Sequence, residues 1–189
     1  MNQWYSRKGL WSLFLACVFP LHVWTIILSL SDFEWVAKRT NAWDAVGVIS
    51  YGLLFALVES LLLFIAATAA GLLISRKWPE PRRVGVLSVL VLILSAWAMY
   101  EQAHFVWGLH LPSAVLRWAE TAGHPVRTMY LLYIGPVVLS FLAPTMLILR
   151  GGRGLQFTKV LFDRLSILSW FYLVLDAAGI AIVVSRNLS

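Results

Sequence analysis

Four side chains that can exchange protons or bind a cation lie inside apolar stretches of the sequence: His22, Glu59, Tyr172 and Asp176. An ionisable side chain at the centre of a bilayer costs at least ~2.5–3.5 kcal/mol on insertion scales, so it normally faces a bundle interior. In transporters such groups form proton relays, cation sites or polar pockets. We therefore predict a polar pocket at mid-membrane depth that contains these four residues. Interhelical hydrogen bonds that only fix the packing are the equally weighted alternative.

The depths of three of these residues allow them to meet. At ~1.5 Å per helical residue, His22 lies ~18 Å and Asp176 ~17 Å from the same end of their spans, and Glu59 reaches about half depth from the other end. Around Glu59 one helix face carries small residues, which let helices approach closely. We therefore expect Glu59 to face another helix. These small residues are Gly52, Ala56, Ala66 and Ala70.

A second polar cluster follows the third apolar stretch. Glu101 and His104 are three positions apart and so share a helix face, while His110 and His124 lie further along the chain. Carboxylates and imidazoles can hold a metal or transfer protons. The spacing matches no established metal motif, and we expect neither a metal nor a cofactor. Glu101 and His104 become the candidate catalytic pair only if the protein is an enzyme.

The elements that must position these residues are membrane-spanning helices. Hydrophobic residues make up 60% of the 189 residues and charged residues 13%, against about 45–50% and about 25% in soluble domains. Five stretches reach the ~17–25 apolar residues that a spanning helix needs. The connections are short, so we predict one transmembrane bundle over residues 1–189. The predicted spans are residues 10–30, 46–74, 84–107, 129–149 and 165–184.

Two connections between the spans look like short interfacial helices. In residues 31–45, Ser31 and Glu34 have the spacing of a capping box. Residues 112–122 carry an apolar stripe and are followed by Pro125, which predicts a helix end. The predicted fold is therefore all-α, with five transmembrane helices and two short interfacial helices on the outer side.

The basic residues indicate the orientation. Ten of the fifteen Lys and Arg side chains fall on the N-terminal side of the predicted topology and five on the other. The positive-inside rule then places the N-terminus in the cytoplasm and the C-terminus outside, most simply in a bacterial cytoplasmic membrane. The net charge of +6 accordingly predicts contact with anionic lipids of the inner leaflet, and no nucleic-acid partner.

These patterns leave several functions open. The leading interpretation is a non-enzymatic membrane protein with a polar midplane pocket, either an accessory subunit of a membrane assembly or a carrier of a small molecule or ion. A partner membrane protein or a second copy of the chain is expected. One alternative is an enzyme that acts at the outer interface on a lipid or lipid-linked substrate through Glu101 and His104. Another is a proton-coupled transporter that uses Glu59 and Asp176.

Overall fold

A computed structural model describes residues 4–74, 77–108 and 112–188, and these are almost entirely helical. Five helices are long and apolar enough to cross a membrane, at 26 to 37 residues each. The predicted all-α fold with five spans is thus confirmed, and the protein is a multi-pass membrane protein. The helices are α1 (Arg7–Arg39), α2 (Ala42–Leu72), α3 (Glu80–Trp107), α4 (Ser113–Thr121), α5 (Pro125–Arg150) and α6 (Gly152–Leu188).

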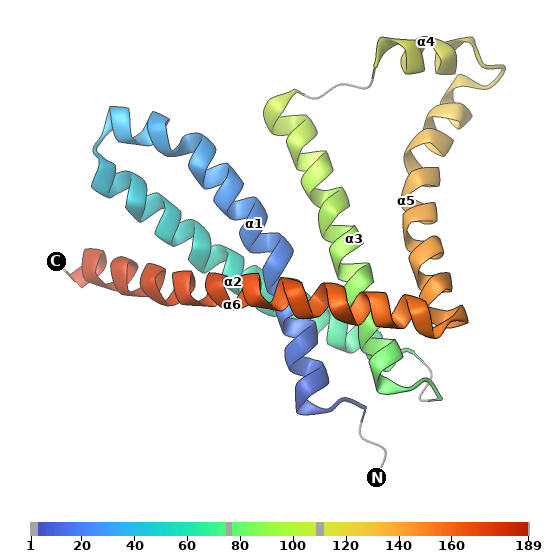
Figure 1. Cartoon of the computed structure of the whole chain (residues 1–189). Helices are drawn as coiled ribbons and strands as arrows, with labels where there is room; N and C mark the ends of the chain where they lie inside the picture. The colour runs from blue at the N-terminus through green and yellow to red at the C-terminus, as the bar shows by residue number, and fades with distance from the viewer. Residues whose placement is uncertain (1–3, 75–76, 109–111, 189) are drawn as a thin grey trace.

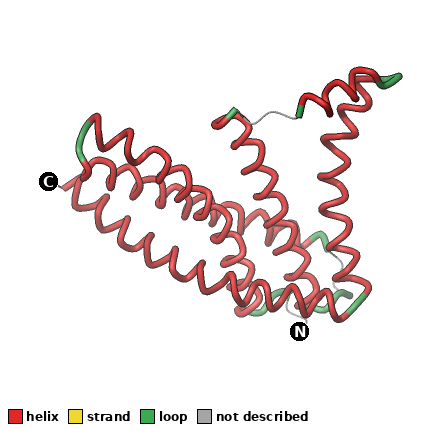
Figure 2. The backbone as a smooth tube through the Cα atoms, turned by 45° about the horizontal axis from the view of Figure 1, so that its top comes forward, coloured by secondary structure: helices red, strands yellow, loops and turns green. Residues whose placement is uncertain are grey.

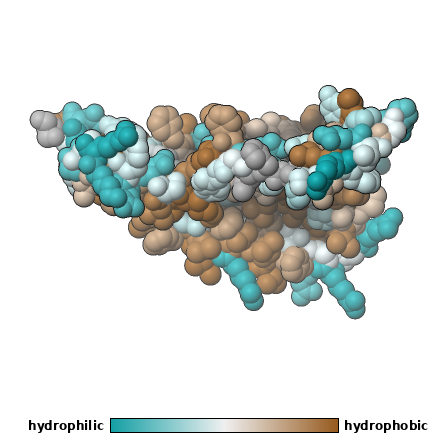
Figure 3. All heavy atoms as spheres, turned by 90° about the horizontal axis from the view of Figure 1, so that it is seen from above, coloured by the Kyte–Doolittle hydropathy of each residue, from teal (hydrophilic) through white to brown (hydrophobic). Residues whose placement is uncertain are grey.

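The long helices do not form a closed barrel-like bundle. α1, α2 and α6 lie side by side, and α3 packs against α1 (Figures 1 and 2). α5 contacts α3 and α6 near one end and diverges from α3 toward the other, where α4 lies across the gap (Figure 1). Figure 3, which shows the molecule from above, has hydrophilic side chains gathered at its left and right and apolar side chains between and below them.

The connections at the two ends of the bundle carry different numbers of Lys and Arg residues. The beginning of α1, the connection from α2 to α3 and the turn from α5 to α6 lie at one end, which we call the basic end (Figure 1). The C-terminus of α6 reaches the start of α2 at the opposite end, where Arg186 Nη2 donates to Asp44 Oδ1 over 2.6 Å. The chain therefore alternates between the ends as five spans require.

The structure corrects the first expected interfacial helix, because residues 31–39 belong to α1 and do not form a separate helix. α1 continues without interruption through residues 31–39 because this segment contains neither Gly nor Pro, and the Ser31 hydroxyl donates to its own helix at Leu28. The break comes at Thr40 and Asn41, where the Asn41 side chain accepts the Asp44 amide over 2.8 Å and begins α2. The second interfacial helix is confirmed as α4.

The best-packed part of the protein lies near the basic end. Its core brings together α1, α2 and α3 through a cluster of apolar side chains. Elsewhere many large apolar side chains are exposed, as expected for surfaces that face lipid. The core cluster comprises Leu13, Cys17, Ala67, Val84, Leu87 and Val91.

A tight turn joins α5 to α6. Only Gly151 separates the two helices, and the first turn of α6 folds back on the last turn of α5. A Cβ atom on Gly154 would lie 2.5 Å from the Leu147 carbonyl oxygen, well inside van der Waals contact. A glycine at position 154 is therefore what permits this crossing, whereas nothing lies within 4 Å of a Cβ placed on Gly152.

Candidate functional site

His22 and Asp176 form a buried pair between α1 and α6. The His22 Nε2 atom lies 3.0 Å from both carboxylate oxygens of Asp176. The two residues are 0% and 2% exposed. The pair therefore joins the first and last spans at a point closed to lipid and solvent.

Hydrogen-bond geometry defines how this pair holds its protons. His22 Nδ1 lies 2.9 Å from the Val18 carbonyl oxygen, which can only accept, so Nδ1 carries a proton. One further proton completes the hydrogen bond between Nε2 and the Asp176 carboxylate. On Nε2 this proton gives an ion pair and on the carboxylate a neutral pair, so the net charge is zero in both arrangements. A pair of this kind satisfies itself without a ligand.

Neighbouring groups fix the orientation of both helices. The Tyr172 ring, one turn before Asp176, stacks on the His22 ring with centroids 5.7 Å apart and planes 7° apart. The Ser169 hydroxyl donates over 2.8 Å to the Leu15 carbonyl oxygen of α1. This carbonyl precedes the Ala16 carbonyl, which loses its helical donor because Pro20 has no N–H. The Ser169 side chain of α6 thus hydrogen-bonds to α1 next to the place where Pro20 interrupts the helical hydrogen bonds.

Glu59 does not join this group, which corrects the predicted four-residue pocket. Its side chain is exposed, and the structure gives it no hydrogen bond or ion pair within the described residues. The buried stripe of α2 runs through Leu53, Ala56, Ser60 and Ala67. Ser60, rather than its neighbour Glu59, takes the inward position, at 0% exposure.

Glu59 instead lines a groove of about 320 Å³ between α1, α2 and α3. Trp24 and Thr25 contribute from α1, and Ser95 and Gln102 from α3. Ser95 is only 7% exposed, and in the described part of the chain its hydroxyl has no hydrogen-bond partner. Trp24 donates its indole N–H to the Gln102 side-chain oxygen across the groove. The groove therefore offers a carboxylate and a free hydroxyl near the middle of the spans.

The sequence interpretation missed Ser95 and Gln102 as site residues. A signal was present, because Ser95, Met99 and Gln102 follow the i, i+4, i+7 spacing of one helix face and all line the groove. The missing step was the order of neighbouring helices. Only the packing of α3 against α1 brings this face toward Glu59.

The cluster at the end of α3 is arranged differently from the expected catalytic pair. The structure gives Glu101, which is exposed, no hydrogen bond or ion pair, whereas His104 Nε2 lies 3.1 Å from the Tyr100 hydroxyl. His124 is exposed at the start of α5, and His110 lies outside the described residues. Across the described ranges, no three His, Cys, Asp or Glu side chains converge as a metal site would require.

Tyr100 also borders an apolar cleft of about 600 Å³ between α3 and α5. Trp97 donates its indole N–H to the Ser140 hydroxyl over 3.0 Å and so links the two helices where they diverge. Val115 of α4 lies at the same cleft, which is otherwise lined mainly by apolar and aromatic side chains.

No family model matches this chain, and neither a curated protein nor a solved structure matches it. Function is therefore inferred from the geometry of the chain itself.

Proposed function

We propose that this protein is a small membrane carrier whose Glu59 groove binds a small molecule with a protonated amine. The observation that carries the proposal is the unpaired Glu59 carboxylate in the middle of α2, at the wall of a groove. An ionisable group within a membrane span marks a substrate or ion pathway by default. A bound cation would offset the cost of placing this carboxylate among apolar side chains.

The other groups of the groove suit an ammonium ligand. The Thr25 and Ser95 hydroxyls can accept hydrogen bonds from an ammonium group, and the Trp24 ring can attract a cation through its π face. Leu21, Leu63 and Leu94 supply apolar walls for a short alkyl segment. A volume of about 320 Å³ fits a small molecule and is at the lower end of the usual range for ligand sites, ~300–1,000 Å³.

In this proposal the His22–Asp176 pair has a structural role and does not bind the ligand. Its two members neutralise each other and are buried, so no ligand is needed to satisfy them. The pair fastens α6 to α1, the helix that contributes Trp24 and Thr25 to the groove.

The test uses the purified full chain in mild detergent and butylamine as the probe. A ligand that binds only the folded state raises the midpoint of thermal unfolding with concentration. We expect butylamine to raise this midpoint in the wild type and in Glu34→Gln, a control that removes a carboxylate far from the groove. We expect no effect in Glu59→Gln, and none from butanol in any variant.

Two results would overturn the proposal. One is an equal response of Glu59→Gln and wild type to butylamine, and the other is an equal response of the wild type to butanol. A second membrane protein that co-purifies in fixed stoichiometry, with no response to the amine, would point instead to an accessory subunit.

An enzyme acting on a lipid substrate is the second candidate. The observation that favours it is the hydrogen bond between Tyr100 and His104, with Tyr100 at the wall of the apolar cleft. A hydroxyl and an imidazole in contact can act as an acid–base pair. In this arrangement Tyr100 takes the place that the sequence interpretation gave to Glu101.

A further inference from the structure

A second polar cavity, separate from the Glu59 groove, lies at the basic end. It has a volume of about 460 Å³ and is formed where the first turns of α1 and α3 meet the first part of α6. Figure 1 shows α6 crossing α1 and α3 in this region. α3 and α6 approach closely here, because a Cβ on Gly85 would lie 3.4 Å from Leu155 and 3.6 Å from Thr158.

The inner wall of this cavity contains Ser88, a residue that is almost fully buried. Ser88 is 1% exposed and lines the cavity, and within the described residues its hydroxyl makes no hydrogen bond. Two other buried serines donate to their own helix, Ser50 to the Val46 carbonyl oxygen and Ser60 to the Ala56 carbonyl oxygen. The Ser88 hydroxyl can therefore donate a hydrogen bond to a ligand atom that enters the cavity. The Ser12 hydroxyl lines the same cavity.

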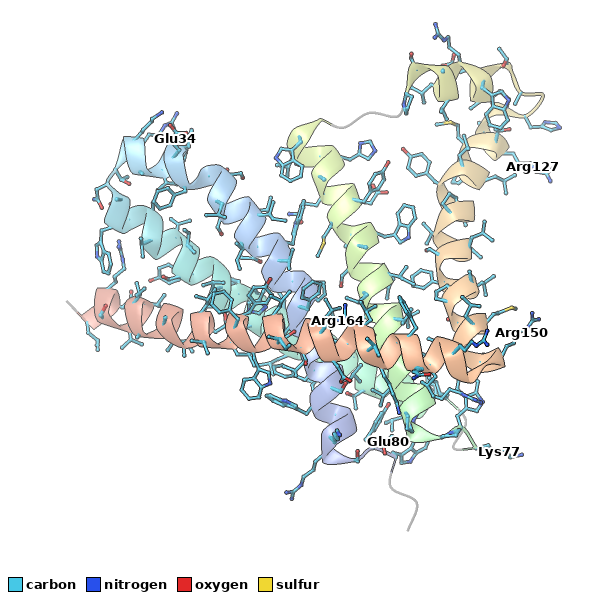
Figure 4. The ribbon with its side chains drawn as sticks, viewed as in Figure 1. Glu34, Lys77, Glu80, Arg127, Arg150 and Arg164 are labelled. Carbon is cyan, nitrogen blue, oxygen red and sulfur yellow. The ribbon has the colours of Figure 1, made fainter. Side chains whose placement is uncertain are left out.

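The charged groups of the cavity are only partly used by the protein itself. Glu80, labelled at the basic end in Figure 4, accepts from the Ser6 amide over 2.7 Å and from the Ser6 hydroxyl over 2.6 Å, next to the start of α1. Lys8, Lys159 and Asp163 are exposed, and the structure gives none of them an ion pair in the described part of the chain. Two cations and one anion thus remain for a ligand.

We propose that this cavity binds the phosphoethanolamine headgroup of a phospholipid. The phosphodiester accepts from the Lys8 and Lys159 ammonium groups and from the Ser12 and Ser88 hydroxyls. The lipid ammonium pairs with Asp163, and the acyl chains follow the apolar surface of the spans. A headgroup with both charges matches the free groups better than a purely anionic headgroup, which leaves Asp163 unpaired. This proposal does not depend on the function assigned to the Glu59 groove.

The test measures lipid retention by native mass spectrometry of the full chain in mild detergent. Phosphatidylethanolamine, phosphatidylglycerol and phosphatidylcholine with identical acyl chains are offered in equal amounts. We expect phosphatidylethanolamine to be retained preferentially. Lys159→Gln and Ser88→Val should each weaken its retention, by about tenfold for Lys159→Gln because that substitution removes a charged hydrogen bond. Arg164→Gln, a basic side chain further along α6 and outside the cavity (Figure 4), should retain the lipid like wild type.

Two further arms separate the possible sources of the phosphate. Asp163→Asn should remove the preference for phosphatidylethanolamine over phosphatidylglycerol while keeping retention of both. Millimolar inorganic phosphate should not displace the lipid. Equal retention of the three lipids by wild type, or unchanged retention by Lys159→Gln, would overturn the proposal. Displacement by phosphate would show a site for a free anion instead.

Discussion

The Nε2 atom of His22 and the carboxylate of Asp176 are 3.0 Å apart, although 154 positions separate them in the chain. This contact connects the first span to the last and is buried on all sides. Because the pair carries no net charge and satisfies its own hydrogen bonds, it fixes the packing of α1 and α6 and leaves ligand binding to other residues.

The first prediction concerns the cost of breaking this pair. Asp176→Leu leaves the His22 Nε2 atom buried without a partner, so the free energy of unfolding should fall by about 2 kcal/mol. This value lies between the ~1–2 kcal/mol of interhelical hydrogen bonds in model membrane peptides and the ~3–5 kcal/mol of broken buried ion pairs in soluble proteins. The double variant His22→Phe, Asp176→Leu should recover most of the loss, because neither polar group remains. Denaturation in detergent measures the free energy of unfolding of the single and of the double variant.

The control for this prediction is Asp32→Asn. Asp32 is an exposed carboxylate near the C-terminal end of α1, and its substitution should leave the free energy of unfolding unchanged. A single variant Asp176→Leu as stable as wild type would show that the pair contributes nothing. A double variant less stable than Asp176→Leu would show that shape, rather than polarity, dominates at this position.

The positions of the five spans could be predicted from the sequence because a bilayer accepts only long, internally hydrogen-bonded apolar segments. The rotation of each helix about its own axis could not be predicted from the sequence. α2 is apolar on nearly all sides and has small residues on more than one face, so the small residues near Glu59 did not identify the face that packs inward. Neighbouring residues such as Glu59 and Ser60 point about 100° apart on a helix. Only the contacts of α2 with α1 and α6 select Ser60 for the interior.

The candidate site was predictable to a similar extent. Asp176 lies on a stripe of small and polar residues that also contains Ser169, Tyr172 and Gly179, and the structure buries all four. The groove next to Glu59 depends on three helices at once, and the sequence does not contain their neighbour order. The break between α1 and α2 also depended on a local detail, the Asn41 cap.

The second prediction concerns the turn between α5 and α6. Gly154→Ala places a methyl group against the Leu147 carbonyl, where the backbone must move. Insertion of a methylene into a packed site typically costs ~1–3 kcal/mol, and we expect a loss of that size in the free energy of unfolding. Gly152→Ala, two positions earlier and open on all sides, is the matched control and should cost nothing. Equal effects of the two substitutions would mean that α6 can leave α5 at another angle.

The third prediction is a loss of stability at high pH through Tyr5. Burial raises the pKa of the Tyr5 phenol above its ordinary value of 10.0, and the nearby Arg83 guanidinium offsets part of this shift. The neutral phenol also donates to the Thr68 carbonyl oxygen over 3.2 Å. Because the folded state raises this pKa, the contribution to stability is complete below pH 10.0. It is lost as the pH rises through the pKa of the folded state.

Chemical denaturation of wild type and Tyr5→Phe between about pH 8 and about pH 11 checks this prediction. Below pH 10.0 the difference in stability between the two proteins should be constant, and above it the wild type should lose stability faster. Parallel curves over the whole range would assign the alkaline transition to other groups.

The fourth prediction separates the residues at the end of α3. If the protein acts as an enzyme, Tyr100→Phe and His104→Ala should both abolish turnover, because each removes one side of their hydrogen bond. Glu101→Gln should keep it, since that side chain is exposed and the structure gives it no contact with the pair. Activity assays in membranes with matched protein levels decide this. Loss of activity in Glu101→Gln and His104→Ala, with activity kept in Tyr100→Phe, would restore the pair expected from the sequence.

The last prediction concerns orientation in the membrane. The structure places the start of α1, the connection from α2 to α3 and the turn from α5 to α6 at the basic end, and the C-terminus at the opposite end with the start of α2 (Figure 1). Basic connections remain in the cytoplasm during insertion. A reporter fused after Lys77 should therefore be cytoplasmic, and reporters fused after Arg117 and after Ser189 should both be outside. If the Lys77 and Ser189 fusions report the same side, one of the three long helices between them, α3, α5 or α6, does not span the membrane. If all three fusions report the reversed sides, the span count stands and the positive charges do not control insertion of this chain.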